Sequence, residues 1–182
     1  MPATTAIETQ PHSQRPDLGA LFTQLNRELF DNQVPVIPVR WSKRMTRSAG
    51  LFWWKQHLGK NEQELECGIR LSLPLLQQRP HTDLLATLAH EMIHAWVALY
   101  LEDLRHGHGI WFQTKMAEVN RMQSEFEVTQ HHSFTEEVQR HAKYRWDCSQ
   151  CGTIYRRQRN SIDVKRHRCG KCRGQLSKVS FM

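Results

Sequence analysis

Apolar residues recur at helical spacing in three segments of the chain. The first segment begins just after Pro16 and predicts an amphipathic helix that ends near Asp31 and Asn32; its apolar face is Leu18, Leu21, Phe22, Leu25, Leu29 and Phe30. The second, an apolar run over residues 84–101, predicts a long buried helix with Thr82 as N-cap and Asp83 in its first turn. The third predicts a helix that packs on the core through Trp111, Phe112, Met116, Val119 and Met122.

Between the first two helices the pattern changes to that of strands. Residues 34–41 are apolar and β-branched but contain Pro35 and Pro38, which fits an edge strand. Residues 47–55 and 64–73 predict two more strands, joined as a hairpin through the turn at 59–61. Alternation places one of the adjacent rings Trp53 and Trp54 in the core and the other outside. The expected fold class is α+β: a helical core with a small three-stranded sheet.

The remaining segments outside the C-terminal region carry weaker signals. Residues 125–130 predict extended chain, and the pattern from Ser133 to Glu136 is that of a capping box that opens a short helix toward His141. Residues 1–15 lack the apolar stretch of a secretory signal, so we expect a short disordered lead and an intracellular protein. Polar residues at His90, Glu91 and His94 interrupt the long apolar run, which favours a buried helix over a membrane span. We therefore expect no membrane association.

Positive charge is concentrated at the C-terminal end. The chain has 182 residues, a net charge of +7 and a mean hydropathy of −0.64, which suit one compact domain with a small appendage. From Arg140 onward, twelve Lys and Arg stand against only Asp147 and Asp163, so the preceding part is net negative. We expect a compact domain over residues 16–141 and a separate basic module over residues 142–182.

The long apolar helix carries a pattern that is typical of a metal site. His90 and His94 lie four residues apart, so both imidazoles lie on one face and point at one centre. Glu91 projects about 100° around the axis, where it reaches a water held by the metal but is poorly placed to ligate. Burying these groups is costly unless a metal with a bound water compensates them. The alternative is a set of hydrogen-bonded core histidines.

A catalytic zinc needs a third protein ligand. The metzincin pattern is excluded, because Val97 and Tyr100 occupy the positions where it requires glycine and histidine. A thermolysin-like site would take a carboxylate from the next helix, where Glu118 is available. His108 is the better candidate, because the glycines on either side of it allow the backbone to turn back sharply. Spacing alone leaves His106 open.

Four of the five cysteines form a second metal motif. Cys148-x-x-Cys151 and Cys169-x-x-Cys172 are separated by seventeen residues, which is the spacing of a zinc ribbon. Disulfides are the alternative, but the reducing compartment expected for this chain favours metal. The ribbon has too little core to fold unaided, so a structural zinc should provide its stability. Cys67, the fifth cysteine, is expected to be a small buried hydrophobe without a function.

Cationic and aromatic residues are interleaved through the basic module. Cations neutralise phosphates and exposed rings stack on unpaired bases, which favours single-stranded or distorted DNA bound without sequence reading. A solvated ribbon, or one that docks acidic protein, is the alternative. The histidines at 131, 132 and 141 are expected to have no metal role. The residues expected to contact nucleic acid are Tyr144, Trp146, Tyr155, Arg156, Arg157, Arg159, Lys165, Arg166 and Arg168.

Several separate motifs resemble the SprT-like metalloprotease domain, and its Spartan type most closely. They are His-Glu-Met-Ile-His-Ala at 90–95, Gly-His-Gly-x-x-Phe at 107–112, Arg-Ser-Ala-Gly-Leu at 47–51 and Ile-Arg-Leu-Ser-Leu-Pro-Leu-Leu at 69–76. The resemblance spans about residues 18–172. It implies a zincin-like core with His108 as the third ligand, a DNA-binding zinc ribbon beside the cleft, and cleavage of proteins crosslinked to DNA. It also implies that the strand with Trp53 and Trp54 lies beside the active site, where a peptide could add to its edge.

The leading hypothesis is a zinc endopeptidase with a role in repair of DNA-protein crosslinks. Each chain would hold two zinc ions, one catalytic at His90, His94 and His108 and one structural at the four paired cysteines, with Glu91 as the catalytic base. We expect a monomer that acts on DNA-bound proteins, in the cytoplasm or nucleoid of a prokaryote or the nucleus of a eukaryote. One alternative is a non-catalytic DNA-binding scaffold, against which intact Glu91 argues. Another is an intracellular peptidase whose ribbon binds RNA or ribosomes.

Overall fold

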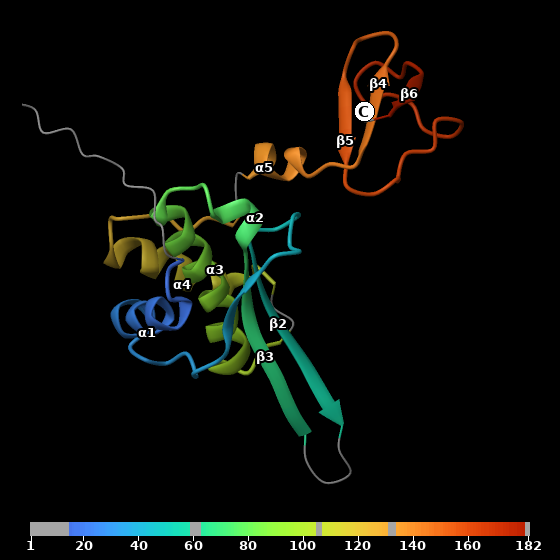
Figure 1. Cartoon of the computed structure of the whole chain (residues 1–182). Helices are drawn as coiled ribbons and strands as arrows, with labels where there is room; N and C mark the ends of the chain where they lie inside the picture. Colours follow the sequence, from blue (N-terminus) through green and yellow to red (C-terminus); the bar gives the residue numbers. More distant parts are fainter. Residues whose placement is uncertain (1–14, 59–62, 105–106, 131–133, 181–182) are drawn as a thin grey trace, which may run out of the picture.

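The computed structural model describes residues 15–58, 63–104, 107–130 and 134–180. Helices and a long hairpin form one part, and a small C-terminal sheet forms the other, joined to it through α5 (Thr135–Arg140) (Figure 1). Residues 1–14 of the predicted lead, the hairpin turn at 59–61 and His106, His131, His132 and Ser133 lie outside the described residues.

Helix α1 (Leu18–Leu29) confirms the first prediction from periodicity. Asp17 caps it, because its carboxylate accepts hydrogen bonds from the backbone N–H groups of Gly19 and Ala20 at 2.9 and 3.2 Å. The helix ends before Asp31 and Asn32, whose φ angles of 51° and 58° are in the left-handed region that these two residue types adopt more readily than others. Its buried face therefore points at the core where the pattern placed it.

The sheet of the helical part has the order β1-β3-β2, with β3 (Gln63–Ser72) in the centre. β2 (Gly50–Leu58) pairs with β3 in antiparallel register, from Gly50 opposite Leu71 to Leu58 opposite Gln63, which confirms the hairpin. β1 (Val39–Ser42) is an edge strand, as predicted, and runs parallel to β3. It begins later than the predicted residue 34, because Pro35 and Pro38 have no N–H to donate to a ladder. The hairpin's outer half extends away from the helices (Figure 1).

Helix α3 (His81–Leu99) is the long apolar helix, and the short α2 (Leu73–Leu76) precedes it. Thr82 is not its N-cap: the chain is extended at Pro80, the helix begins directly after it, and no side chain caps that end. Asp83 does lie in the first turn, where its carboxylate is 2.8 Å from the guanidinium of Arg79. The helix ends at Leu99, two residues before the end of the apolar run at residue 101.

Helix α4 (Ile110–Met122) packs on the core through a narrower face than predicted. Phe112 and Val119 are fully buried, whereas the side chains of Trp111 and Met122 are 53% and 45% exposed. Lys115 takes the central buried position of this face. Residues 125–130 form neither helix nor strand, and α5 begins after Phe134 without a side-chain cap. The predicted capping box includes Ser133, which lies outside the described residues.

One apolar core holds the helices and the first sheet together. α3 lies between the sheet and the helices α1 and α4 (Figure 1). The largest fully buried apolar side chains of this part are Phe30, Val34, Ile69, Leu71, Leu75, Leu88, Met92, Ile93, Val97, Phe112 and Val119. Among the described residues, no helix has the length and hydropathy needed to cross a membrane.

The C-terminal part is a three-stranded antiparallel sheet with the order β5-β4-β6. Its strands are β4 (Tyr144–Cys148), β5 (Ile154–Arg157) and β6 (Leu176–Val179). Its small core consists of Cys148, Cys169 and Leu176, with Tyr155, Ile162 and Val164 packed against them. The fold class is thus α+β, with a helical zincin-like core and a C-terminal zinc ribbon, as the sequence predicts.

Candidate metal centres and active site

Three imidazoles converge at the middle of the helical part. His90 and His94 come from successive turns of α3, and His108 comes from the turn before α4. The Nε2 atom of His108 lies 3.2 Å from Nε2 of His94 and 3.2 Å from Nε2 of His90. The possible ligand atoms of the three residues all lie within 4.8 Å of one another. Three nitrogens that share one centre are the donor set of a metal ion.

The spacing of these nitrogens fits zinc. A tetrahedral zinc with Zn–N distances of about 2.0–2.1 Å separates its nitrogen ligands by roughly 3.4 Å, close to the distances observed here. Glu118, the carboxylate alternative, is instead paired with the ammonium of Lys115 at 3.2 Å and is not a member of the cluster. The three histidines therefore fit a tetrahedral zinc site whose fourth ligand position can be taken by a water molecule.

The chain orients the His90 ring through its other nitrogen. Nδ1 of His90 lies 2.8 Å from the carbonyl oxygen of Thr129, so it donates its proton there and leaves Nε2 as the lone-pair nitrogen. The segment that carries Thr129 is fixed by Asn120 on α4. The Asn120 amide donates to the Val128 carbonyl at 2.9 Å and accepts from the Val128 N–H at 2.8 Å. Sequence reasoning missed this support, because a single asparagine carries no signal of a partner eight residues away.

The Phe112 ring packs against the imidazole rings of all three histidines. Its centroid lies 4.9 Å from that of His90, 4.5 Å from that of His94 and 4.6 Å from that of His108. Phe112 is fully buried, so it restricts the rings to the orientations in which their nitrogens converge. The Gly-His-Gly-x-x-Phe spacing places the imidazole of His108 against the ring of Phe112, because the two residues lie on either side of the start of α4.

Glu91 lies against β2 and outside the histidine cluster. Its Oε2 accepts a hydrogen bond from the backbone N–H of Phe52 at 2.5 Å, and its side chain is buried. Burial raises the pKa of Glu91 to about 7, although the Phe52 hydrogen bond lowers it. A carboxyl with a pKa near neutrality is suited to taking up and releasing a proton.

Gly50 provides the space for that carboxylate. A Cβ atom at Gly50 would lie 2.5 Å from Oε1 of Glu91 and 2.6 Å from its Cγ. Sequence reasoning did not assign Gly50 a role, although it lies in the Arg-Ser-Ala-Gly-Leu motif. The motif therefore has a physical reason: the strand must pass close to the glutamate of α3.

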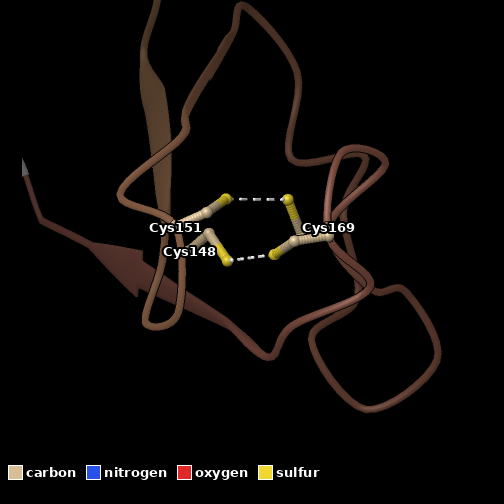
Figure 2. A group of neighbouring side chains, drawn as sticks. Cys148, Cys151 and Cys169 are labelled. Atoms are coloured by element: carbon tan, nitrogen blue, oxygen red, sulfur yellow. Dashed lines mark hydrogen bonds between the residues drawn. The ribbon is translucent and has the colours of Figure 1, made fainter.

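The four paired cysteines form the second cluster. Figure 2 shows Cys148, Cys151 and Cys169 with their sulfur atoms turned toward one another. The Sγ atoms of Cys148 and Cys172 lie 3.4 Å apart, those of Cys151 and Cys169 lie 3.6 Å apart, and all four lie within 4.8 Å. A disulfide requires about 2.05 Å, so these are free thiols. A tetrahedral zinc with Zn–S bonds of about 2.3 Å separates its sulfurs by roughly 3.8 Å, which fits.

The electrostatics of this cluster favour a bound cation. The Tyr155 hydroxyl lies 3.2 Å from Sγ of Cys169 and accepts from the backbone N–H of Gly170 at 2.9 Å, so its own proton points at the sulfur. This hydrogen bond lowers the pKa of Cys169 to about 6. Hydrogen bonding to Cys151, among the crowded sulfurs, raises the pKa of Cys172 to about 12. Without a cation, the Cys169 thiol ionises readily and the Cys172 thiol does not. A bound cation would stabilise both as thiolates.

Most residues expected to contact nucleic acid lie on the surface of the ribbon. All six cations of this set are exposed, namely Arg156, Arg157, Arg159, Lys165, Arg166 and Arg168. Tyr144 is half-buried, with the ammonium of Lys178 5.0 Å from its ring centroid. Trp146 is a correction: its side chain is fully buried, so its ring cannot stack on a base. The half-buried Tyr155 is held at Cys169 by its hydroxyl.

The tryptophan pair of β2 also differs from expectation, since neither ring enters the core. Trp53 lies over Gly68 with the guanidinium of Arg70 4.7 Å from its centroid, and Trp54 is 41% exposed. The reason is that Phe52 takes the core position of this strand, where α3 covers the sheet. Cys67 is half-buried and its pKa is raised by burial, which agrees with the absence of an activated thiol.

A helix that carries two converging histidines with a buried glutamate between them, packed on a small sheet, defines the zincin class of metalloprotease fold. Comparison with known proteins identifies the family within that class. The SprT-like family matches residues 18–132, and the SprT-like zinc ribbon domain matches residues 142–180. The chain belongs to the SprT-like family.

Proteins from animals and from a bacterium are similar in sequence to this chain. The DNA-dependent metalloprotease SPRTN of Homo sapiens is 41% identical over 135 residues, and that of Rattus norvegicus is 40% identical over 135 residues; each match covers 74% of this chain and 26% of the relative. The chain thus spans about a quarter of the length of these relatives. Protein SprT-like of Lactococcus lactis is 27% identical over 151 residues, which are 82% of each chain.

Proposed function

We propose that this protein is a zinc-dependent endopeptidase that cleaves proteins bound or crosslinked to DNA. The observation that carries the proposal is the convergence of His90, His94 and His108 beside the buried carboxyl of Glu91. Residues 16–141 would form the protease subdomain, and residues 142–182 the DNA-binding subdomain. The names of the SPRTN relatives as DNA-dependent metalloproteases support the same assignment.

The chain's own residues would divide the chemistry as follows. The three imidazoles would hold a zinc ion, which would supply Lewis-acid activation of a water and of the scissile carbonyl. Glu91 takes up a proton from the attacking water at its carboxylate and passes it to the leaving amine. Its raised pKa, caused by burial, makes both transfers possible near neutral pH. Thr129 and Phe112 hold the imidazoles so that this geometry exists before substrate arrives.

The substrate would bind along the free edge of β2. This strand is at the edge of its sheet, because β3 lies between it and β1. The backbone N–H of Phe52 points away from β3 toward Glu91, so the edge of β2 faces the proposed catalytic residues. An extended peptide added to this edge would pass them, and the exposed ring of Trp54 would lie along its path.

Replacement of the proposed base tests the catalytic role. Glu91→Gln should reduce cleavage of a denatured protein substrate by about 10²- to 10⁴-fold, the contribution of a general acid-base group. The zinc content of the variant, measured by elemental analysis, should remain two per chain. Glu118→Gln is the matched control, because Glu118 lies outside the histidine cluster and should retain activity. Full activity of Glu91→Gln would remove the proposed mechanism.

The ribbon is proposed to confine cleavage to substrates on DNA, in the nucleoid or cytoplasm of a prokaryote or the nucleus of a eukaryote. Charge reversal of Arg156 and Arg157 to Glu should weaken binding of single-stranded DNA and flatten its salt dependence. Cleavage should then lose its stimulation by DNA. Stimulation that stays complete would exclude the ribbon as the sensor. Stimulation of the intact protein by RNA in place of DNA would favour a peptidase of RNA-bound substrates, and absence of any cleavage would favour a scaffold.

A further inference from the structure

A side-chain contact joins the ribbon to the protease part. Gln158, just after β5, meets Thr46 in the segment between β1 and β2. The Thr46 hydroxyl donates to Oε1 of Gln158 at 3.1 Å, and Nε2 of Gln158 donates to the Thr46 carbonyl oxygen. The two bonds form a pair between residues 112 positions apart in the chain. They fix which side chains of the two parts face each other.

Arginines flank both members of this contact. Arg47 follows Thr46, and Arg156, Arg157 and Arg159 surround Gln158 in sequence. All four line one hollow between the two parts, with a volume of about 490 Å³. The other lining residues are Val138, Gln139, Ala142, Gln158 and Ser161, none of which is acidic. The hollow therefore concentrates four positive charges without a neutralising side chain in its wall.

The chemistry of this hollow selects a phosphodiester. Four guanidinium groups in one hollow repel one another unless an anion lies between them, and the planar guanidinium fork matches a phosphate in two parallel hydrogen bonds. The volume exceeds that of a single phosphate ion. The apolar side chains of Val138 and Ala142 offer contact to a sugar rather than to a second anion.

We propose that the backbone of single-stranded nucleic acid binds in this seam, with Arg47 as the contact from the protease part. The inference rests on the proposed function, because it specifies where the DNA lies. Arg47 is three residues before Gly50 and five before Phe52, the two positions that contact Glu91. A strand held in the seam thus touches the segment that leads directly into the catalytic edge of β2. Nucleic acid would then bridge both parts of the protein.

Neutral variants of single arginines test the site. Arg47→Gln and Arg159→Gln should each weaken binding of a fluorescein-labelled oligo-dT of eight nucleotides by about 5- to 10-fold in anisotropy titrations at low salt. Each should lower the slope of log K against log salt by about 0.7. Arg44→Gln is the matched control, since Arg44 is exposed in the same segment but does not line the hollow. An equal loss in the control would overturn the proposal, because net charge alone would then explain binding.

A double variant asks whether the two arginines share a ligand. Arg47→Gln with Arg159→Gln should lose less affinity than the product of the two single losses, whereas independent losses would contradict a common site. Inorganic phosphate and thymidine monophosphate serve as competitors. If either competitor displaces the oligonucleotide at a competitor concentration near the dissociation constant of the oligonucleotide, the hollow binds a small anion and the proposal is overturned.

The outcome is separable from that of the proposed function. If the intact protein shows no DNA-stimulated proteolysis while Arg47→Gln still weakens DNA binding selectively, the seam site stands and the proposed function fails. If DNA stimulates proteolysis and Arg47→Gln binds DNA as well as the unaltered protein, the proposed function stands and the seam site fails.

Discussion

Glu91 on α3 and Phe52 on β2 are joined by a hydrogen bond of 2.5 Å from the Phe52 backbone N–H to Oε2 of the carboxylate. The bond fixes the proposed base to the strand beside which a substrate would lie. Because the donor is a backbone group, no substitution of the Phe52 side chain removes it directly. The position of the carboxylate therefore depends on the backbone position of β2. Gly50 allows that backbone to pass close to the Glu91 side chain.

We expect Gly50→Ala to displace the Glu91 carboxylate. The added Cβ would lie 2.5 Å from Oε1 and 2.9 Å from Cδ of Glu91, distances that force a shift of the side chain or of the strand. A shift of about 1 Å in a catalytic group costs on the order of 10²-fold in rate, so kcat/KM for a peptide substrate should fall by about that factor. Zinc content should not change. Gly170→Ala is the control, since its Cβ would meet only an ordinary contact at 3.6 Å.

Asn120 and Asn26 allow a matched test of ring orientation. Each asparagine clamps a backbone eight residues later: Asn120 clamps Val128, and Asn26 clamps Val34 with bonds of 2.8 and 3.1 Å. Either asparagine to Ala should lower the free energy of unfolding by about 1–3 kcal/mol, because backbone groups lose their partners. Only the Asn120 segment carries Thr129, which orients His90.

Zinc affinity should therefore separate the two variants. Asn120→Ala should weaken binding at the histidine site by about 10- to 100-fold, the usual effect of losing support behind a ligating histidine. Asn26→Ala should leave that affinity within about twofold. Competition with a chromophoric chelator measures both. Equal zinc affinities in the two variants would mean that the Thr129 carbonyl keeps its place without Asn120.

The sequence predicts the parts of this protein that depend on local spacing. The four-residue interval of His90 and His94 on an apolar helix, and the two Cys-x-x-Cys pairs, bring their donor atoms together because a helix turn and a metal knuckle have fixed geometry. Gly50 could be recognised only once β2 was placed against α3, since its role depends on a contact with Glu91, 41 residues further along the chain. The same holds for Trp146, whose aromatic side chain suits a stacking platform as well as a small core.

The burial of Lys115 in the core could not be predicted from local spacing either, and it leads to a prediction about stability. Its side chain is only 4% exposed, and its ammonium lies 5.3 Å from the ring centroid of Phe30 and 5.1 Å from that of Trp96. Lys115→Ala should destabilise the protein by about 2–4 kcal/mol, because it removes both cation–π contacts and leaves a cavity. Lys115→Met should change stability by less than about 1.5 kcal/mol, because methionine fills similar space without a buried charge. Urea unfolding followed by tryptophan fluorescence compares them; equal losses would mean that the charge itself is required.

Removal of metal should affect the two parts of the protein differently. The ribbon has few buried apolar residues, namely Trp146, Leu176 and two of its own metal-binding cysteines, Cys148 and Cys169, so little apolar area remains to hold the sheet without the ion. The helical part has an extensive apolar core that does not include its three histidines. Chelation should therefore raise amide hydrogen exchange throughout β4, β5 and β6 to the rate of unfolded chain, while α1 and most of α3 keep their protection. Protection of the ribbon strands that survives complete metal removal would show that the sheet is held by packing instead.

Tyr155→Phe should make the ribbon lose its metal at lower chelator concentration, because it removes the hydroxyl that stabilises the Cys169 thiolate.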